Sequence, residues 1–239
     1  TLYQLYEWAH TPWEWHADLF EYANSLGLEA FSSPFDNSAV DFLEELEVPA
    51  YKIASFELID LPLIKYVASK GKPMIMSTGM ASEEEISEAI DAAKEGGCEE
   101  LALLRCNSAY PAPINEMDLK TIPDMIDRFE VPVGLSDHTL GVNAAISSVC
   151  LGGCIIEKHL CISRNDPGPD SKFSLEPQEM ETLVVGIREI EDAMGGVRYG
   201  PSEREEHNLR YRRSIYVIED IQEGGEISEE NVRSIRPGL

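Results

Sequence analysis

The chain has 239 residues, and 44 acidic against 19 basic side chains give it a formal net charge of −25. Such an acidic surface repels nucleic acid and anionic membranes, so neither is expected as a partner. No apolar run approaches the ~20 residues of a membrane span, and polar residues interrupt any leader-like segment at the start. The sequence therefore predicts a cytoplasmic protein.

Short apolar strands alternate with amphipathic helices along most of the chain, and nearly every strand ends in a polar residue. Alternation implies a parallel sheet covered by helices. Polar strand ends are typical of an active-site rim, which favours a (β/α) barrel over a doubly wound sheet. Helices are expected at 12–26, 36–46, 61–70, 82–95, 118–129, 142–151 and 176–194, and strands at 29–34, 50–55, 73–78, 101–106, 131–138 and 154–160.

The number of expected strands bears on the fold class. A closed barrel of this kind normally has eight strands, and the sequence offers six. We therefore expect a TIM (β/α)8-type barrel at residues 1–200 that lacks its first two βα units, followed by a polar linker at 201–213. From residue 214 the pattern becomes a strand and turn without a crossover helix, which indicates the start of a second, incomplete domain at 214–239.

Two of the expected strands end in a histidine, His138 and His159. The helix expected between them has the length of a crossover, so the two strands should be parallel neighbours with both histidines at the same end. Two imidazoles, with water and substrate oxygens in the remaining positions, suit Mn²⁺, Zn²⁺ or Fe²⁺. A metal site is favoured here over two histidines that merely cap their strands by hydrogen bonding.

A lysine, Lys52, lies inside the apolar strand at 50–55, where a buried ammonium is costly unless it meets an anion. Hydroxyl groups at neighbouring strand ends, together with this lysine, would suit a phosphate or carboxylate. The alternatives are an internal salt bridge from Lys52 to Glu57 or Glu157, and hydroxyls that only cap helices. The hydroxyl side chains concerned are Ser33, Ser55, Thr78, Ser108 and Ser136.

Three further residues continue the expected rim. Glu57, just past a strand end, could act as a general acid or base, or be an exposed loop carboxylate. Tyr110 shares the parity of Cys106 and Ser108 beyond the strand at 101–106. Asp170 follows Gly-Pro, a turn that can hold a carboxylate towards bound hydroxyl groups, although turn formation alone would also explain it.

Six motifs follow one another in the chain: Phe-Ser-Ser-Pro-Phe-Asp at 31–36, Tyr-Lys-Ile-Ala-Ser-Phe-Glu at 51–57, Met-Ser-Thr-Gly-Met at 76–80, Gly-Leu-Ser-Asp-His-Thr-Leu-Gly at 134–141, Ile-Glu-Lys-His at 156–159 and Gly-Pro-Asp at 168–170. Together they resemble the sialic acid synthase family, whose members condense phosphoenolpyruvate with an N-acylated amino sugar. The segments 214–224, 227–232 and 236–238 resemble the opening of the family's SAF (antifreeze-like) domain. Residues 11–16 and Phe56 are more similar to the pseudaminic acid branch than to the N-acetylneuraminate branch.

The resemblance implies roles for individual residues. It implies a divalent metal, typically Mn²⁺, with Mg²⁺ or Co²⁺ as alternatives, on His138 and His159, and proton transfer assisted by Glu57. It implies a sugar site at Tyr110 and Asp170, small-molecule substrates, and a homodimer for the full-length form. Phosphoenolpyruvate would be surrounded by Lys52, Ser33, Ser55, Ser108 and Ser136.

Other functions remain open on the same residues. Within the resemblance, an N-acetylneuraminate or legionaminic acid synthase is the alternative to a pseudaminic acid synthase. A metal-dependent aldolase with Lys52 as a Schiff base would use the same rim. A non-catalytic, truncated sugar-binding relative would need neither metal nor turnover.

Overall fold

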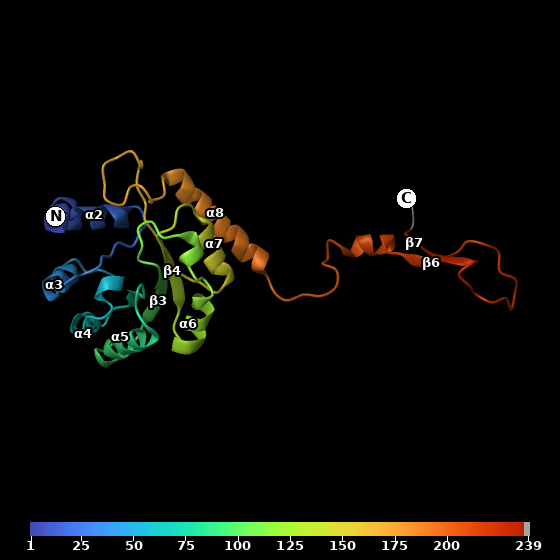
Figure 1. Ribbon diagram of the computed structural model, residues 1–239, viewed down its shortest axis with the longest axis horizontal. Helices are drawn as coiled ribbons and strands as arrows, with labels where there is room; N and C mark the ends of the chain where they lie inside the picture. Colours follow the sequence, from blue (N-terminus) through green and yellow to red (C-terminus); the bar gives the residue numbers. More distant parts are fainter. Residues whose placement is uncertain (237–239) are drawn as a thin grey trace. The chain divides into compact units, whose positions relative to one another are not determined.

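A computed structural model describes residues 1–236, apart from the side chain of Leu2. The chain divides into two compact units, Thr1–Met194 and Gly195–Leu239. The first unit contains a parallel sheet with its helices, and the second contains a short hairpin (Figure 1).

The sheet of the first unit has five parallel strands that pair in chain order. Consecutive strand order is that of a (β/α) barrel wall, whereas a doubly wound sheet reverses direction at a switch point. The expected α/β fold is thus confirmed in the form of a five-stranded half-barrel. The strands are β1 (Tyr51–Ile53), β2 (Met74–Ser77), β3 (Leu101–Cys106), β4 (Val133–Asp137) and β5 (Ile156–Lys158).

Helices connect the strands and cover their outer side (Figure 1). Among the described residues, three α-helices precede the first strand, and three short 3-10 turns interrupt the loops. The α-helices are α1 (Leu2–Ala9), α2 (Trp13–Ser25), α3 (Asn37–Glu45), α4 (Leu61–Ala68), α5 (Glu83–Glu95), α6 (Thr121–Phe129), α7 (Asn143–Cys150) and α8 (Pro177–Met194), and the 3-10 turns are η1 (Ser55–Glu57), η2 (Ile114–Glu116) and η3 (Glu206–Tyr211).

The core lies between the sheet and these helices. On the outward face of β1 and β2, alternate residues such as Ile53 and Met76 are fully buried, and they belong to the same cluster as Ile64 of α4 and Ile90 of α5. Apolar burial of this kind is the main force that holds helices against a sheet. Because strand side chains alternate, the other parity is left for the inner face.

Helix starts follow the capping signals in the sequence. Ser82 accepts a hydrogen bond from the Glu85 backbone, and the Glu85 carboxylate accepts one from the Ser82 backbone, which forms a capping box at α5. Asp36 and Asp60 cap α3 and α4 by accepting bonds from backbone N–H groups. Three of the helices that contribute to the core therefore begin at residues whose side chains cap them.

The prediction of a strand at 29–34 is wrong, because the structure shows no strand in this segment. Its backbone contact with the sheet is one bond, from Lys52 N to Ser32 O at 3.3 Å. Pro34 has no N–H to extend a ladder, and a single bond does not make a strand. The segment still runs beside β1, so Ser33 reaches the strand ends without belonging to a strand.

The second unit contains β6 (Ser214–Val217) and β7 (Val232–Ile235), which pair antiparallel. A strand at residue 214 is present as expected. Every residue of β6 is exposed, so this unit has little core of its own among the described residues. The SAF assignment remains a prediction, and part of its motif, Pro237 and Gly238, lies outside the described residues.

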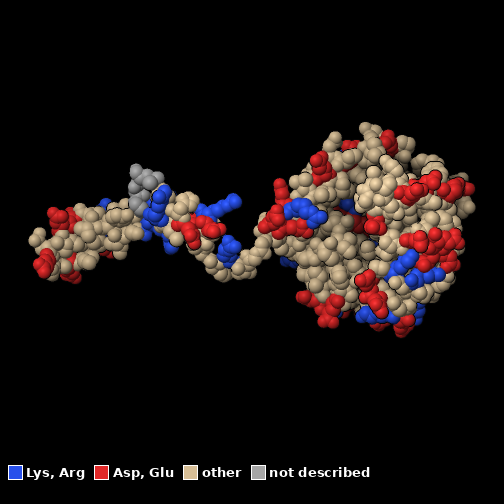
Figure 2. Space-filling model, turned by 180° about the vertical axis from the view of Figure 1, so that it is seen from behind, with Lys and Arg blue, Asp and Glu red and all other residues tan. Residues whose placement is uncertain are grey.

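Acidic side chains are spread widely over the visible face of the first unit (Figure 2). Some cations of the first unit are paired with carboxylates, as Arg128 is with Glu83 and Asp124. None of the described helices combines the length and the low polarity that crossing a bilayer requires.

Candidate active site

A cavity of about 220 Å³ lies at the carboxyl ends of the five strands. Lys52, Ser77, Ser136 and Glu157 enter it from β1, β2, β4 and β5, because they share the inward parity of the sheet. Its full lining is Ser33, Lys52, Ala54, Ser55, Ser77, Tyr110, Ser136, His138, Glu157 and His159.

The two histidines meet in this cavity, with ring centroids 5.2 Å apart. The Tyr110 ring lies 4.3 Å from that of His138, and the Phe173 ring lies 4.9 Å from that of His159. Phe173 is buried and was not singled out from the sequence. The sequence-based expectation that both histidines reach one end of the sheet is confirmed in geometry.

Close approach of β4 and β5 depends on a glycine. A Cβ added to Gly134 would lie 2.1 Å from the backbone oxygen of Ile155 on the neighbouring strand segment. Only glycine lets the two backbones come this near, so Gly134 allows the spacing that brings His138 and His159 together.

Each imidazole has an acceptor at Nδ1. His138 Nδ1 donates to the Asn107 carbonyl oxygen at 2.9 Å, and His159 Nδ1 lies 3.5 Å from Asp170 Oδ2. An acceptor at Nδ1 orients the ring and leaves the Nε2 lone pair available, which is the usual support of a metal-binding histidine. The two imidazoles therefore fit a divalent cation whose other ligands are water and substrate.

A protein-only metal site is not formed, because the described residues contain no group of three or more His, Cys, Asp or Glu side chains arranged to hold an ion.

Burial and neighbouring groups shift the pKa values of the two imidazoles in opposite directions. Burial would lower the pKa of His138, but its contacts with Cys106 and Asn107 raise it overall, whereas burial lowers the pKa of His159.

Lys52 is buried at the cavity wall and pairs with Glu157 at 3.2 Å. Of the two salt bridges considered from the sequence, this one is formed, and Lys52 nevertheless lines the cavity. Ser136 donates to the other Glu157 oxygen. A carboxylate thus organises the cation and one hydroxyl, both of which could turn to an anionic ligand.

The cavity contains a hydroxyl that the sequence analysis missed. Ser77 is 2% exposed, lines the cavity, and its Oγ has no hydrogen-bond partner. Thr78, at the same strand end, instead donates to the Leu104 carbonyl oxygen. The strand register supplies the missing information, because Ile75 stands opposite Lys52 in the sheet and Ser77 shares the inward parity of Ile75.

Three predicted site residues lie at the rim without lining the cavity. Ser108 Oγ contacts Cys106 Sγ at 3.7 Å, and Asp170 contacts His159 as described. Glu57 is half-buried, its Oε2 has no partner, and burial raises its pKa although Lys52 opposes this. A raised pKa favours the protonated form of a carboxyl group, which is the form that can donate a proton.

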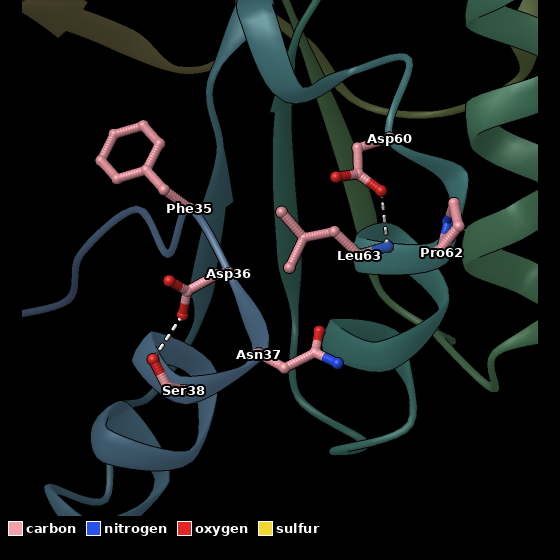
Figure 3. A pocket seen from close by; sticks show the side chains of 7 residues that line it. All are labelled: Phe35, Asp36, Asn37, Ser38, Asp60, Pro62 and Leu63. Atoms are coloured by element: carbon pink, nitrogen blue, oxygen red, sulfur yellow. Dashed lines mark hydrogen bonds between the residues drawn. The ribbon is translucent and has the colours of Figure 1, made fainter.

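A second, larger pocket of about 470 Å³ lies between the starts of α3 and α4 (Figure 3). Its only ionisable side chains are Asp36 and Asp60, and both already cap these helices. We therefore assign the chemistry to the strand-end cavity. The pocket is lined by Phe35, Asp36, Asn37, Ser38, Asp60, Pro62 and Leu63.

Comparisons with known proteins agree on one family. A model described as the NeuB family matches residues 1–199. A pseudaminic acid synthase of Campylobacter jejuni is 43% identical over 238 residues, which is 100% of this chain and 69% of that protein. An N,N'-diacetyllegionaminic acid synthase of Legionella pneumophila is 40% identical, over 100% of this chain and 68% of that protein.

A solved structure gives the same result for the fold. The N-acetylneuraminic acid synthetase of Leptospira borgpetersenii, crystallised in complex with citrate, superposes with a TM-score of 0.81 at 31% identity. The match covers 87% of this chain and 73% of that one.

Proposed function

The chain belongs to the NeuB family, and on this premise we propose that it condenses phosphoenolpyruvate with an N-acylated amino sugar to give a nonulosonic acid and phosphate. The observation that carries the proposal is the cavity that gathers Lys52, several hydroxyls, His138 and His159 at one sheet edge. The sugar that leads to pseudaminic acid is favoured because of the 43% identity to a pseudaminic acid synthase.

Phosphoenolpyruvate is the anionic substrate, and a chain with a net charge of −25 must attract it through local groups. Lys52 supplies the charge, and hydroxyls on both sides of it donate to phosphate and carboxylate oxygens. The groups proposed for this role are Lys52, Ser33, Ser55, Ser77 and Ser136, with Ser108 next to them.

The amino sugar is proposed to lie between Tyr110 and Asp170. The Tyr110 ring offers an apolar wall beside His138, and the Asp170 carboxylate, half exposed, can accept bonds from sugar hydroxyls. His138 and His159 would hold a divalent cation, with Mn²⁺ favoured and Mg²⁺ or Co²⁺ as alternatives. Such an ion supplies Lewis-acid polarisation of the sugar aldehyde.

In the proposed reaction, C3 of phosphoenolpyruvate attacks the aldehyde carbon, water adds at C2, and phosphate leaves by cleavage of the C–O bond. Lys52 and the hydroxyls keep the attacking carbon in line, since orientation of two bound reactants provides much of the rate. Glu57 is proposed to hand over a proton next to Lys52, because burial raises its pKa and so favours the protonated form.

Phosphate release from phosphoenolpyruvate, measured across a panel of amino sugars, tests the proposal. We expect release only with an N-acylated amino sugar and a divalent cation present, and fastest with the amino-sugar precursor of pseudaminic acid. Fastest turnover of the amino-sugar precursor of legionaminic acid or of N-acetylneuraminate would reassign the substrate. No release with any sugar would overturn the synthase function.

Two other functions give different results in simple assays. A Schiff-base aldolase would form a borohydride-stable pyruvate adduct on Lys52. A non-catalytic sugar-binding protein would bind amino sugar in calorimetry without metal and without turnover. The homodimer of the full-length form, the SAF assignment of 214–239 and a cytoplasmic location also remain predictions.

A further inference from the structure

One residue before each cavity histidine, the sheet contains a buried ion pair that faces away from the cavity. Asp137 and Lys158 stand opposite each other in the last register pair of β4 and β5. Lys158 Nζ lies 2.8 Å from Asp137 Oδ2, and their side chains are 2% and 0% exposed, respectively, for the lysine and the aspartate. Alternation along both strands puts this pair on the helix-covered side.

Bonds from this pair bracket His138. Lys158 Nζ donates to the Thr139 carbonyl oxygen as well as to Asp137. Asp137 Oδ1 accepts a bond from Thr139 N at 2.8 Å. The residues on both sides of His138 are therefore tied to each other and to the residue that precedes His159.

The backbone ladder alone holds this end of the sheet weakly. β5 has three residues, all half-buried, and its pairing with β4 ends at Asp137 and Lys158. The histidines lie one step beyond the last pair. On the far side, His159 is held by one further backbone bond, from Leu175 N to its carbonyl oxygen at 2.8 Å.

Overall stability does not explain why a charged pair occupies this position. Burying two charges costs desolvation that their attraction hardly exceeds, and apolar residues of similar size often serve a fold equally well. Unlike apolar packing, a hydrogen-bonded ion pair fixes both the distance between its two groups and their relative orientation. We propose that the Asp137–Lys158 pair is a positioning device that fixes the separation and orientation of His138 and His159.

The inference rests on the proposed function only in that the two imidazoles share a cation, and its first test needs no cation. The test variant is Asp137→Asn combined with Lys158→Met, which removes both charges and keeps an acceptor for Thr139 N. The matched control is Glu44→Gln with Lys72→Met, a partly buried ion pair whose Glu44 also binds Tyr51 on the outward face of β1. Lys158→Arg, which keeps the charge, is the conservative rescue variant.

Imidazole nitrogen signals in NMR spectra of the metal-free protein report the positions of the rings. We expect the signals of His138 and His159 to move or broaden in the test variant, and those of His10, His16 and His207 to stay. The control pair should leave all five unchanged, and Lys158→Arg should retain the parent signals. Unmoved His138 and His159 signals, or a test variant that does not fold, would overturn the positioning role.

Mn²⁺ titration by calorimetry gives the second readout. The affinity of the test variant should fall by about 10-fold, the lower end of what loss of outer-shell support costs a metal site. Unchanged affinity beside a well-folded test variant would contradict the inference. If the parent protein bound no Mn²⁺ and released no phosphate, the proposed function would fail, and the imidazole signals alone would still decide the positioning role.

Discussion

Each face of the sheet carries a lysine–carboxylate ion pair, and the two pairs differ in exposure to solvent. On the cavity face, Lys52 pairs with Glu157, whose side chain is 40% exposed. On the helix-covered face, Lys158 pairs with Asp137, whose side chain is not exposed at all. Because Glu157 is partly exposed, Lys52 can exchange this carboxylate for an anionic ligand. Asp137 and Lys158 are both shielded from solvent and stay paired with each other.

The difference shows that parity along a strand, more than residue type, determines whether a charged side chain lines the cavity or packs under the helices. Neighbouring residues on β5, Glu157 and Lys158, serve opposite faces. Changes to cavity-lining side chains should therefore affect turnover directly, and changes to the Asp137–Lys158 pair should affect it only through the positions of the two histidines.

Removing a cavity histidine should have the largest effect. With His138→Ala or His159→Ala, metal-dependent phosphate release should fall to background, because a single imidazole does not hold the cation against water. The measurement is phosphate release with and without added Mn²⁺. His207→Ala, on the exposed η3, is the control and should keep the parent rate. Near-parent rates in either cavity variant would remove the metal assignment.

Replacing the cavity lysine should have the next largest effect. Lys52→Met should lower kcat/KM for phosphoenolpyruvate by about 10²-fold, since one charge-assisted contact in a water-poor site is lost. Steady-state kinetics with varied phosphoenolpyruvate measures it, and the exposed Lys65→Met serves as the control. A normal KM for phosphoenolpyruvate in the Lys52 variant would contradict its role as the anion-binding group.

A third change sharpens the comparison through the backbone between the faces. Gly134→Ala should destabilise the first unit by about 1–3 kcal/mol, the usual cost of overpacking, because its Cβ would meet the Ile155 oxygen. Denaturant unfolding measures this. Gly196→Ala, where an added Cβ meets nothing within 4 Å, should leave the unfolding free energy unchanged. Equal unfolding free energies for the two variants would show that β4 and β5 can move apart at residue 134 without loss of stability.

The smallest effect concerns pH on the outward face of β1. Burial would raise the pKa of Glu44, but its bonds with Lys72 and Tyr51 outweigh this and lower it. A lowered folded-state pKa adds stability that is present above the unfolded value near 4.5 and is lost as pH falls through the folded value. The contribution should stay below about 1 kcal/mol for a partly exposed pair.

Melting temperatures between pH 6 and pH 3 measure this contribution. Glu44→Gln should lose less stability on acidification than the parent chain does. Parallel melting curves for the two proteins would show that the ion pair adds nothing.

Much of the candidate site could be predicted from residue patterns, and the exceptions have identifiable causes. His138, His159 and Lys52 stand out because polar residues end or interrupt apolar strands, and they do meet in one cavity. Ser77 was missed because Thr78 stands closer to the strand end, although only Ser77 has the inward parity. The strand prediction at 29–34 failed because Pro34 has no N–H to donate and a single backbone hydrogen bond does not make a ladder.

Local chemistry in the sequence determined the alternation of helices and strands, the helix caps and the family, because period, capping and motif spacing are properties of short segments. Only the tertiary structure decided which parity of each strand faces the cavity, and that Lys52 would meet Glu157 while Lys158 met Asp137. Those pairings depend on strand register, which is set by the simultaneous packing of all five strands and their helices.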